Sequence, residues 1–128
     1  MESTTAWVDA PAIQLDVERL DVYAVAREFD ALAARLLPRR GQAALRDQLA
    51  RASSSIMLNI AEGAGRFAGA DKAHFYLIAR GSTMECAAVL DVMLGRGLLT
   101  DASYRHARGL LVRVLQMLTR LAQRMQSR

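Results

Sequence analysis

Apolar residues recur at steps of three and four along four segments of this chain, and proline or glycine residues separate those segments. This spacing places the apolar side chains on one face of an α-helix. In the second segment, for example, Leu45, Leu49, Ala52, Ile56 and Ile60 form one stripe. The pattern therefore predicts four amphipathic helices and no strand.

Short connections join the predicted helices. Pro38 ends the first helix, which starts near residue 16, and a glycine cluster at 63, 65 and 69 ends the second. The third helix starts near residue 70 and ends at glycines 95 and 97. Thr100 or Asp101 is a suitable N-cap for the fourth, which reaches about residue 126. Helices joined in this way lie antiparallel, so we expect an up-down-up-down four-helix bundle over residues 15–128, after a loose arm at residues 1–14.

Composition agrees with one all-α domain. The chain has 128 residues, of which 52% are hydrophobic but only 5% aromatic, so aliphatic side chains must fill the core. A single cysteine, Cys86, allows no internal disulfide. We find neither a secretory signal nor an apolar run long enough to span a membrane. A soluble cytoplasmic protein without membrane contact is expected.

The third and fourth helices have different apolar patterns. The apolar pattern of the third helix predicts a buried face made of Phe75, Ile78, Ala79, Ser82, Cys86, Val89 and Met93. The fourth carries more apolar residues than one stripe needs, and Val112 and Leu115 lie outside that stripe. This excess favours self-association, because apolar surface that stays exposed to water carries a free-energy cost. Partial exposure of both residues is the alternative.

A polar row borders the apolar stripe of the second helix. Its members are spaced by three and four, and are Gln48, Arg51, Ser55, Asn59, Glu62 and Arg66. Glu62 and Arg66 are spaced to form an ion pair, and Asn59 suits a hydrogen bond to another helix. With Glu85 of the third helix, this row predicts polar contacts that hold helices and subunits together. A solvated face with ordinary ion pairs is the alternative.

Small residues interrupt the helices where close packing is useful. Gly63, Gly81 and Ser82 allow a neighbouring backbone to approach, which offsets the cost of about 1 kcal/mol that glycine carries inside a helix. A ligand slot at Gly81 and Ser82 is the alternative.

Positive charge is concentrated at the C-terminal end. Residues 1–38 carry seven acids against three arginines, whereas no acid follows Asp101. The arginines after that position are Arg105, Arg108, Arg113, Arg120, Arg124 and Arg128. Such a surface favours contact with the phosphates of RNA or DNA. An arginine-rich solvated face is the simpler interpretation of charge alone.

Two segments resemble a known bacterial family. They are Ser55-Ile56-x-x-Asn59-Ile60-Ala61-Glu62-Gly63-x-Gly65-Arg66 and His74-Phe75-Tyr76-Leu77-Ile78-Ala79-Arg80-Gly81-Ser82-x-x-Glu85. Over roughly residues 18–126 the chain is similar to the four-helix-bundle proteins encoded in intervening sequences of 23S rRNA genes. The resemblance implies a ring-shaped homopentamer without known catalytic activity. A related branch, the accessory variability determinant of diversity-generating retroelements, implies a basic pentamer that binds nucleic acid and cooperates with a reverse transcriptase.

Catalytic chemistry has little support in the sequence. The nearest approach to a di-metal motif is Asp71-x-x-His74, and a second such pair is missing, with His106 the only other histidine. Cys86 sits among apolar neighbours, where a thiol is inert. The glycines at 63, 65 and 69 follow a helix, whereas a dinucleotide motif follows a strand. We therefore expect no enzyme activity, no catalytic residue, no metal and no cofactor.

These observations lead to one functional hypothesis and one alternative. The hypothesis is a non-catalytic, pentameric accessory or scaffold protein whose basic surface contacts RNA or DNA without sequence specificity. The alternative is a protein-binding module of a larger complex, such as a reverse-transcriptase complex, whose groove is formed by the apolar excess of the fourth helix.

Overall fold

The computed structural model describes residues 14–127, and these residues form four α-helices preceded by one short 3-10 helix. The elements are η1 (Asp16–Arg19), α2 (Asp21–Leu36), α3 (Ala43–Ala64), α4 (Gly69–Gly95) and α5 (Asp101–Gln126). The all-α, four-helix prediction is confirmed. Gln14 is the only described residue of the arm predicted at 1–14, and Arg128 also lies outside the described residues.

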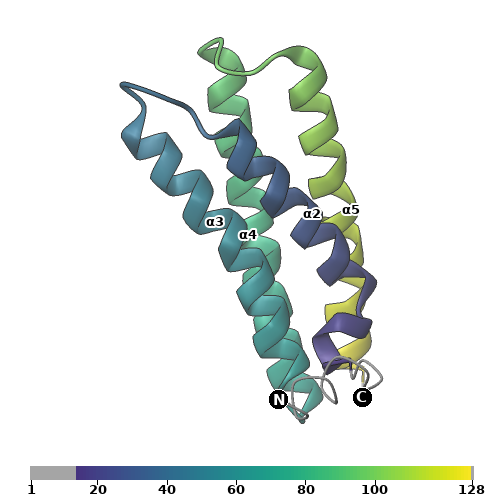
Figure 1. The fold of residues 1–128 in the computed structure, drawn as a ribbon. Coiled ribbons are helices and arrows are strands. Elements are labelled where there is room, and N and C mark those ends of the chain that lie inside the picture. The colour runs from purple at the N-terminus through teal and green to yellow at the C-terminus, as the bar shows by residue number, and fades with distance from the viewer. Residues whose placement is uncertain (1–13, 128) are drawn as a thin grey trace, which may run out of the picture.

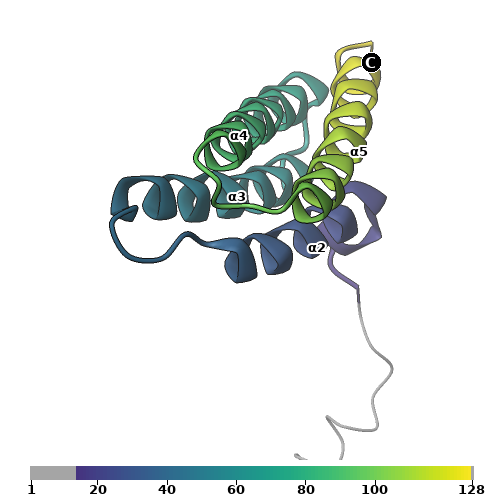
Figure 2. The same cartoon turned by 90° about the horizontal axis from the view of Figure 1, so that it is seen from above.

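The four helices alternate in direction, and each packs against two others (Figure 1). α4 lies against α3 and α5, and α2 lies against the same two helices from the other side. Figure 2 shows the bundle from above, with α3 between α2 and α4. Among the described residues, the buried side chains are mostly aliphatic, and Phe29 and Tyr76 are the only aromatic ones, as the composition predicts.

The helix ends lie near the capping and glycine residues that the sequence indicated. Thr100 caps α5, because its Oγ1 accepts a hydrogen bond of 3.1 Å from the Ser103 N–H. Gly41 and Gly97 hold left-handed backbone in the two longer turns, with φ of 81° and 71°. The first predicted helix differs in detail, since extended backbone at Leu20 separates η1 from α2.

Lys72 closes the C-terminal end of α3. Its Nζ donates to the carbonyl oxygens of Gly63 and Ala64, at 3.4 Å and 3.0 Å. These carbonyls lie at the last turn of the helix, where they carry the negative end of its dipole, and the Gly63 oxygen also accepts a bond of 3.2 Å from the Arg66 N–H. A lysine on the first turn of α4 therefore fixes the short α3–α4 turn.

α3 and α4 are in tight contact at Gly63. A Cβ at this position would lie 2.6 Å from Cε1 of Tyr76, which is too close for any real contact. Tyr76 is only 2% exposed, so its ring has little room to move. Only glycine fits here, and the aromatic ring takes the space of the missing side chain.

The predicted buried face of α4 was wrong in its N-terminal half. Ile78 is 39% exposed, and Phe75 and Ser82 are only half-buried. The positions that face the core are Ala73, Tyr76, Ala79, Thr83, Cys86, Val89, Leu90 and Met93. Because Tyr76 packs on Gly63, the helix is rotated by about one residue relative to the predicted stripe.

The contact at Gly63 predicts opposite effects for two glycine substitutions. Gly63→Ala overpacks the α3–α4 contact, at a cost of about 1–3 kcal/mol, which outweighs the gain in helix propensity. We expect a net loss of about 1 kcal/mol in the free energy of unfolding. Gly109→Ala is the matched control, because Gly109 lies within α5 with nothing within 4 Å of its missing Cβ.

For Gly109→Ala we expect a gain of about 0.5–1 kcal/mol. Denaturant unfolding of both variants at one protein concentration checks this. A gain of stability in both would contradict the close contact.

Candidate functional site

The middle of the polar row forms a seam between α3 and α4. The hydroxyls of Ser55 and Ser82 lie 2.8 Å apart and share a hydrogen bond. Asn59 does not cross to α4, contrary to the prediction: its Nδ2 donates to the carbonyl oxygen and Oγ of Ser55, at 2.9 Å and 3.0 Å. Asn59 therefore orients Ser55, and Ser55 makes the link to the next helix.

The end of the row reaches the surface. Arg66 Nη2 lies 3.2 Å from Glu62 Oε2, as the spacing predicts, and its guanidinium lies 4.7 Å from the centre of the Phe75 ring. Both members of this ion pair are about half-exposed, so the pair adds little stability by itself. Arg51 and Glu85 are exposed, and Arg51 Nε reaches only the Asp47 carbonyl of its own helix, at 3.4 Å.

Polar side chains also join other pairs of neighbouring helices. The bonds run from Ser53 Oγ to Asp30 Oδ1 (2.9 Å), Arg80 Nε to Thr119 Oγ1 (2.9 Å) and Tyr104 OH to Asp91 Oδ1 (2.6 Å). The bond to Asp91 raises the pKa of the Tyr104 phenol. Across residues 14–127, no side-chain hydrogen bond joins α2 to α5.

The outer face of α4 is apolar. Leu77, Met84 and Val92 are 44%, 53% and 39% exposed, and Gly81 and Ala88 lie between them at helical spacing. Among residues 14–127 nothing approaches Gly81 closely from outside its own helix, because an added Cβ would meet no such atom within 4 Å. The open side of Gly81 belongs to this exposed face.

The sequence assigned the apolar excess to the fourth helix, and the structure corrects this. Val112 and Leu115 of α5 are half-buried. They line a groove of about 320 Å³ between α4 and α5, together with Met84, Ala87, Leu90 and Leu111. Asp91, Tyr104 and Arg108 line it as well. The larger exposed apolar surface lies on α4.

The arginines of α5 occupy its solvent side. Arg105, Arg113, Arg120 and Arg124 lie within roughly 100° of the helix circumference, at about 100° per residue. Arg108 lies further round, beside the groove. All five side chains are exposed, and in the part of the chain that the structure describes none pairs with a carboxylate. We call these residues the arginine face.

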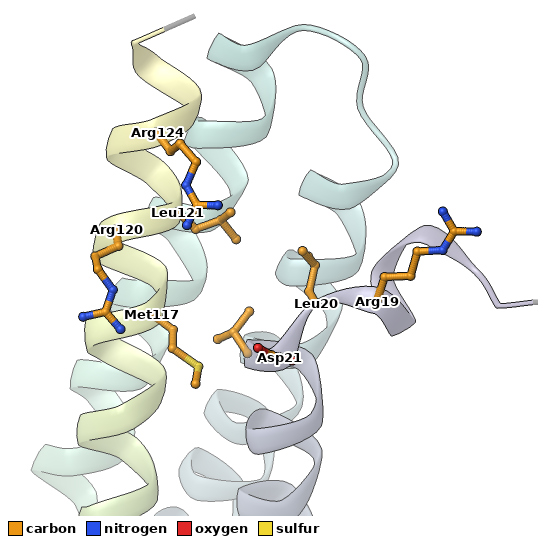
Figure 3. A pocket seen from close by; sticks show the side chains of 8 residues that line it. Arg19, Leu20, Asp21, Met117, Arg120, Leu121 and Arg124 are labelled. Carbon is orange, nitrogen blue, oxygen red and sulfur yellow. The ribbon is translucent and has the colours of Figure 1, made fainter.

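A basic pocket adjoins this face. The start of α2 and the last turns of α5 enclose about 330 Å³ (Figure 3). Arg120 and Arg124 extend from one wall, and Met117 and Leu121 point across the gap. Arg19 stands on the opposite wall with its side chain directed away. Among the described residues Asp21 is the only acid that lines the pocket, which Arg19, Arg120 and Arg124 also line.

Neither the cysteine nor the histidines form a reactive group. Cys86 is fully buried, and burial, with Glu85 and Asp30 nearby, raises the pKa of its thiol to about 12. No cluster of three metal-ligating side chains occurs between residues 14 and 127. His74 stacks edge-on against Phe75, with ring centres 5.2 Å apart. No helix among the described residues is long and apolar enough to cross a membrane.

Several surface residues were missed by the sequence analysis. Leu58 and Phe67 are 65% and 102% exposed near the α3–α4 turn, and the outer residues of α4 were not singled out. Leu77, Gly81, Met84, Ala88 and Val92 recur at steps of three and four, and this second apolar stripe was the signal that could have shown the outer face of α4.

Comparison with known proteins supports the family resemblance. A family model described as 23S rRNA-intervening sequence protein matches residues 18–120, which extend from η1 into the second half of α5. No curated protein matches the chain.

The raised pKa of Cys86 predicts its reactivity. We expect iodoacetamide at pH 8 to leave the folded chain unmodified and to alkylate it in guanidinium chloride, because only the thiolate reacts. Since the folded-state pKa is raised, the stability contributed by the buried thiol is present below the ordinary pKa of 9.0 and is lost as pH rises towards 12. Mass spectrometry reports the modification, and rapid labelling of the folded chain at pH 8 would contradict the burial.

Proposed function

The chain belongs to the 23S rRNA-intervening sequence protein family, and on that basis we propose that it is a non-catalytic cytoplasmic protein that assembles into a homopentameric ring and binds the phosphate backbone of RNA or DNA. The observation that carries the proposal is the arginine face of α5, whose five exposed arginines have no acidic partner in residues 14–127.

Charge distribution supports phosphates as the ligand. α5 carries five arginines and a single acid, Asp101, which lies in its first turn. Arginine forms a planar fork of donors that matches phosphate oxygens. The basic pocket beside Arg120 and Arg124 adds a concave site next to the exposed row. Contacts of this kind position a protein on nucleic acid without reading its sequence.

Exposed apolar surface supports the assembly. The outer face of α4 presents Leu77, Met84 and Val92 at helical spacing, with the small residues Gly81 and Ala88 between them. Small residues let another backbone approach, and a continuous apolar face of this kind marks a protein contact. Arg105, Arg113, Arg120 and Arg124 lie on the solvent side of α5, so a ring closed through α4 leaves these four arginines free and repeats them in every subunit.

Binding to a generic duplex should depend steeply on salt. We expect the affinity to fall between about 50 and 200 mM salt, because bound phosphates release counterions. Replacing Arg113, Arg120 and Arg124 together by Gln should reduce the slope of log K against log salt by about one for each phosphate that the variant no longer neutralises. Fluorescence anisotropy with labelled DNA and RNA duplexes measures both quantities.

The matched control removes the same charge from the other end of the bundle. Arg39, Arg40 and Arg46 are exposed around the α2–α3 turn, and their replacement by Gln should leave the slope nearly unchanged. Absence of binding at low salt would overturn the proposal, and so would binding that salt does not affect. An equal reduction of affinity in the two triple variants would place the phosphate-binding surface elsewhere than α5.

The proposed homopentamer predicts a particle whose molar mass is five times that of one chain. Light scattering coupled to chromatography should give this mass for the wild-type protein, and Met84→Asp should lower it, because a carboxylate on the α4 face would be desolvated in the interface. Gln116→Asp, on the exposed side of α5, is the control that should keep the assembly. A wild-type protein that runs as single chains at micromolar concentration would refute the ring.

A protein-binding module is the second candidate, and the apolar groove between α4 and α5 favours it. In that case the chain would serve a larger complex, such as one with a reverse transcriptase, without touching nucleic acid. Leu115→Glu would then abolish capture of the partner, whereas the triple arginine variant would not.

A further inference from the structure

Phe67 is the most exposed large apolar side chain in residues 14–127. It lies in the turn between α3 and α4 and is 102% exposed. A buried aromatic side chain removes about 150–250 Å² from water, so leaving this ring in solvent forgoes a large stabilisation. Leu58, near the same end of α3, is 65% exposed. The α3–α4 turn therefore carries a protruding apolar group that nothing in the described part of the chain covers.

The groove between α4 and α5 is a complementary feature. Its volume of about 320 Å³ exceeds that of one phenylalanine side chain, and Leu90, Leu111 and Leu115 are among its apolar walls. Asp91 and Arg108 also line it, and Arg66, which is ion-paired with Glu62, immediately precedes Phe67 in the chain. The exposed Glu62–Arg66 pair thus offers an anion to Arg108 and a cation to Asp91.

One chain cannot bring the two features together. Phe67 precedes the first residue of α4, and the groove begins at Thr83 of the same helix. At 1.5 Å per residue, these positions are separated by roughly 24 Å along a continuous helix. Contact between them therefore requires two copies of the chain.

We propose that the Phe67 ring of one subunit inserts into the α4–α5 groove of its neighbour. This inference rests on the self-assembly proposed above and names the surfaces that meet. Met84 belongs both to the groove wall and to the exposed face of α4, so one neighbour covers both surfaces. The contact joins two different patches, which is the heterologous arrangement: each subunit gives Phe67 to one neighbour and its groove to the other, and the chain of subunits forms a ring when the rotation between neighbours closes.

Disulfide trapping tests the contact directly. A chain with Phe67→Cys and Val112→Cys should form a ladder of covalent multimers on oxidation, because two cysteines cross-link only when their Cβ atoms lie about 3.5–4.5 Å apart. Each single variant should give no ladder, and an equal mixture of the two should stop at covalent dimers. Native Cys86 does not interfere, since it is fully buried.

The matched control moves the second cysteine to the exposed side of α5. Phe67→Cys with Gln116→Cys should give no ladder, because Gln116 does not line the groove. A ladder of equal yield in this control would overturn the proposal, since it would show collision rather than a defined contact.

Light scattering on side-chain variants gives an independent measurement. Phe67→Ser should shift the midpoint of dissociation to at least tenfold higher protein concentration, and Phe67→Leu should retain most of the assembly. Leu15→Ser removes an apolar side chain that is 66% exposed elsewhere and should have no effect. Circular dichroism should be unchanged, because a fully exposed side chain contributes nothing to the fold of one subunit.

The outcomes separate this inference from the assembly on which it rests. A wild-type protein that assembles, with neither a ladder nor any effect of Phe67→Ser, would overturn the Phe67 contact and leave the ring standing. A wild-type protein of one chain would overturn both. A covalent product that stops at two chains in the double variant would support the contact and exclude the ring.

Discussion

The close contact between Gly63 and Tyr76 sets the rotation of α4, and the surface of the molecule follows from that rotation. Because a Cβ at residue 63 would lie 2.6 Å from the tyrosine ring, Tyr76 occupies a position that only a glycine partner can create. Tyr76 in the core turns its sequence neighbours Phe75 and Leu77 towards the rim and the solvent. The ring of Phe75 then meets Arg66, whose ion pair with Glu62 ends the polar row.

The same constraint explains what could be predicted from the sequence. The buried stripe of α3 and the solvent side of α5 follow from periodicity, because polar residues occupy the opposite face of each helix. α4 has apolar residues on all sides, so its pattern identifies a helix but leaves its rotation undetermined. The rotation comes from a contact between Gly63 and Tyr76 that periodicity does not encode. The same distinction applies to the candidate site. The arginines of α5 can be identified in the sequence as a basic run, whereas the residues that α4 exposes depend on how the helix packs.

The polar row has a different role at each end. Ser55 and Asn59 are half-buried, and they tie α3 to α4 through Ser82, so this part of the row belongs to the fold of one chain. Glu62 and Arg66 are exposed beside Phe67 and Leu58. Charged groups near exposed apolar side chains are common at protein interfaces, where charged groups at the rim restrict the orientation of the partner. The row therefore joins the interior of one bundle to the surface that we assign to subunit contact.

The proposed self-association and the proposed phosphate binding use different surfaces: the first uses the outer side of α4 with the α4–α5 groove, and the second uses the solvent side of α5. This separation determines how they combine. If α4 is covered by a neighbour, the only strongly basic helix among the described residues remains at the surface of every subunit. Several weak arginine faces held in one particle bind a long polyanion far more tightly than a single face, because each contact raises the effective concentration of the next. On the proposed function, nucleic-acid binding therefore depends on assembly, because each single ion contact is weak and salt-sensitive. Phosphate binding by the arginines of α5 would then depend on assembly through the exposed apolar side of α4.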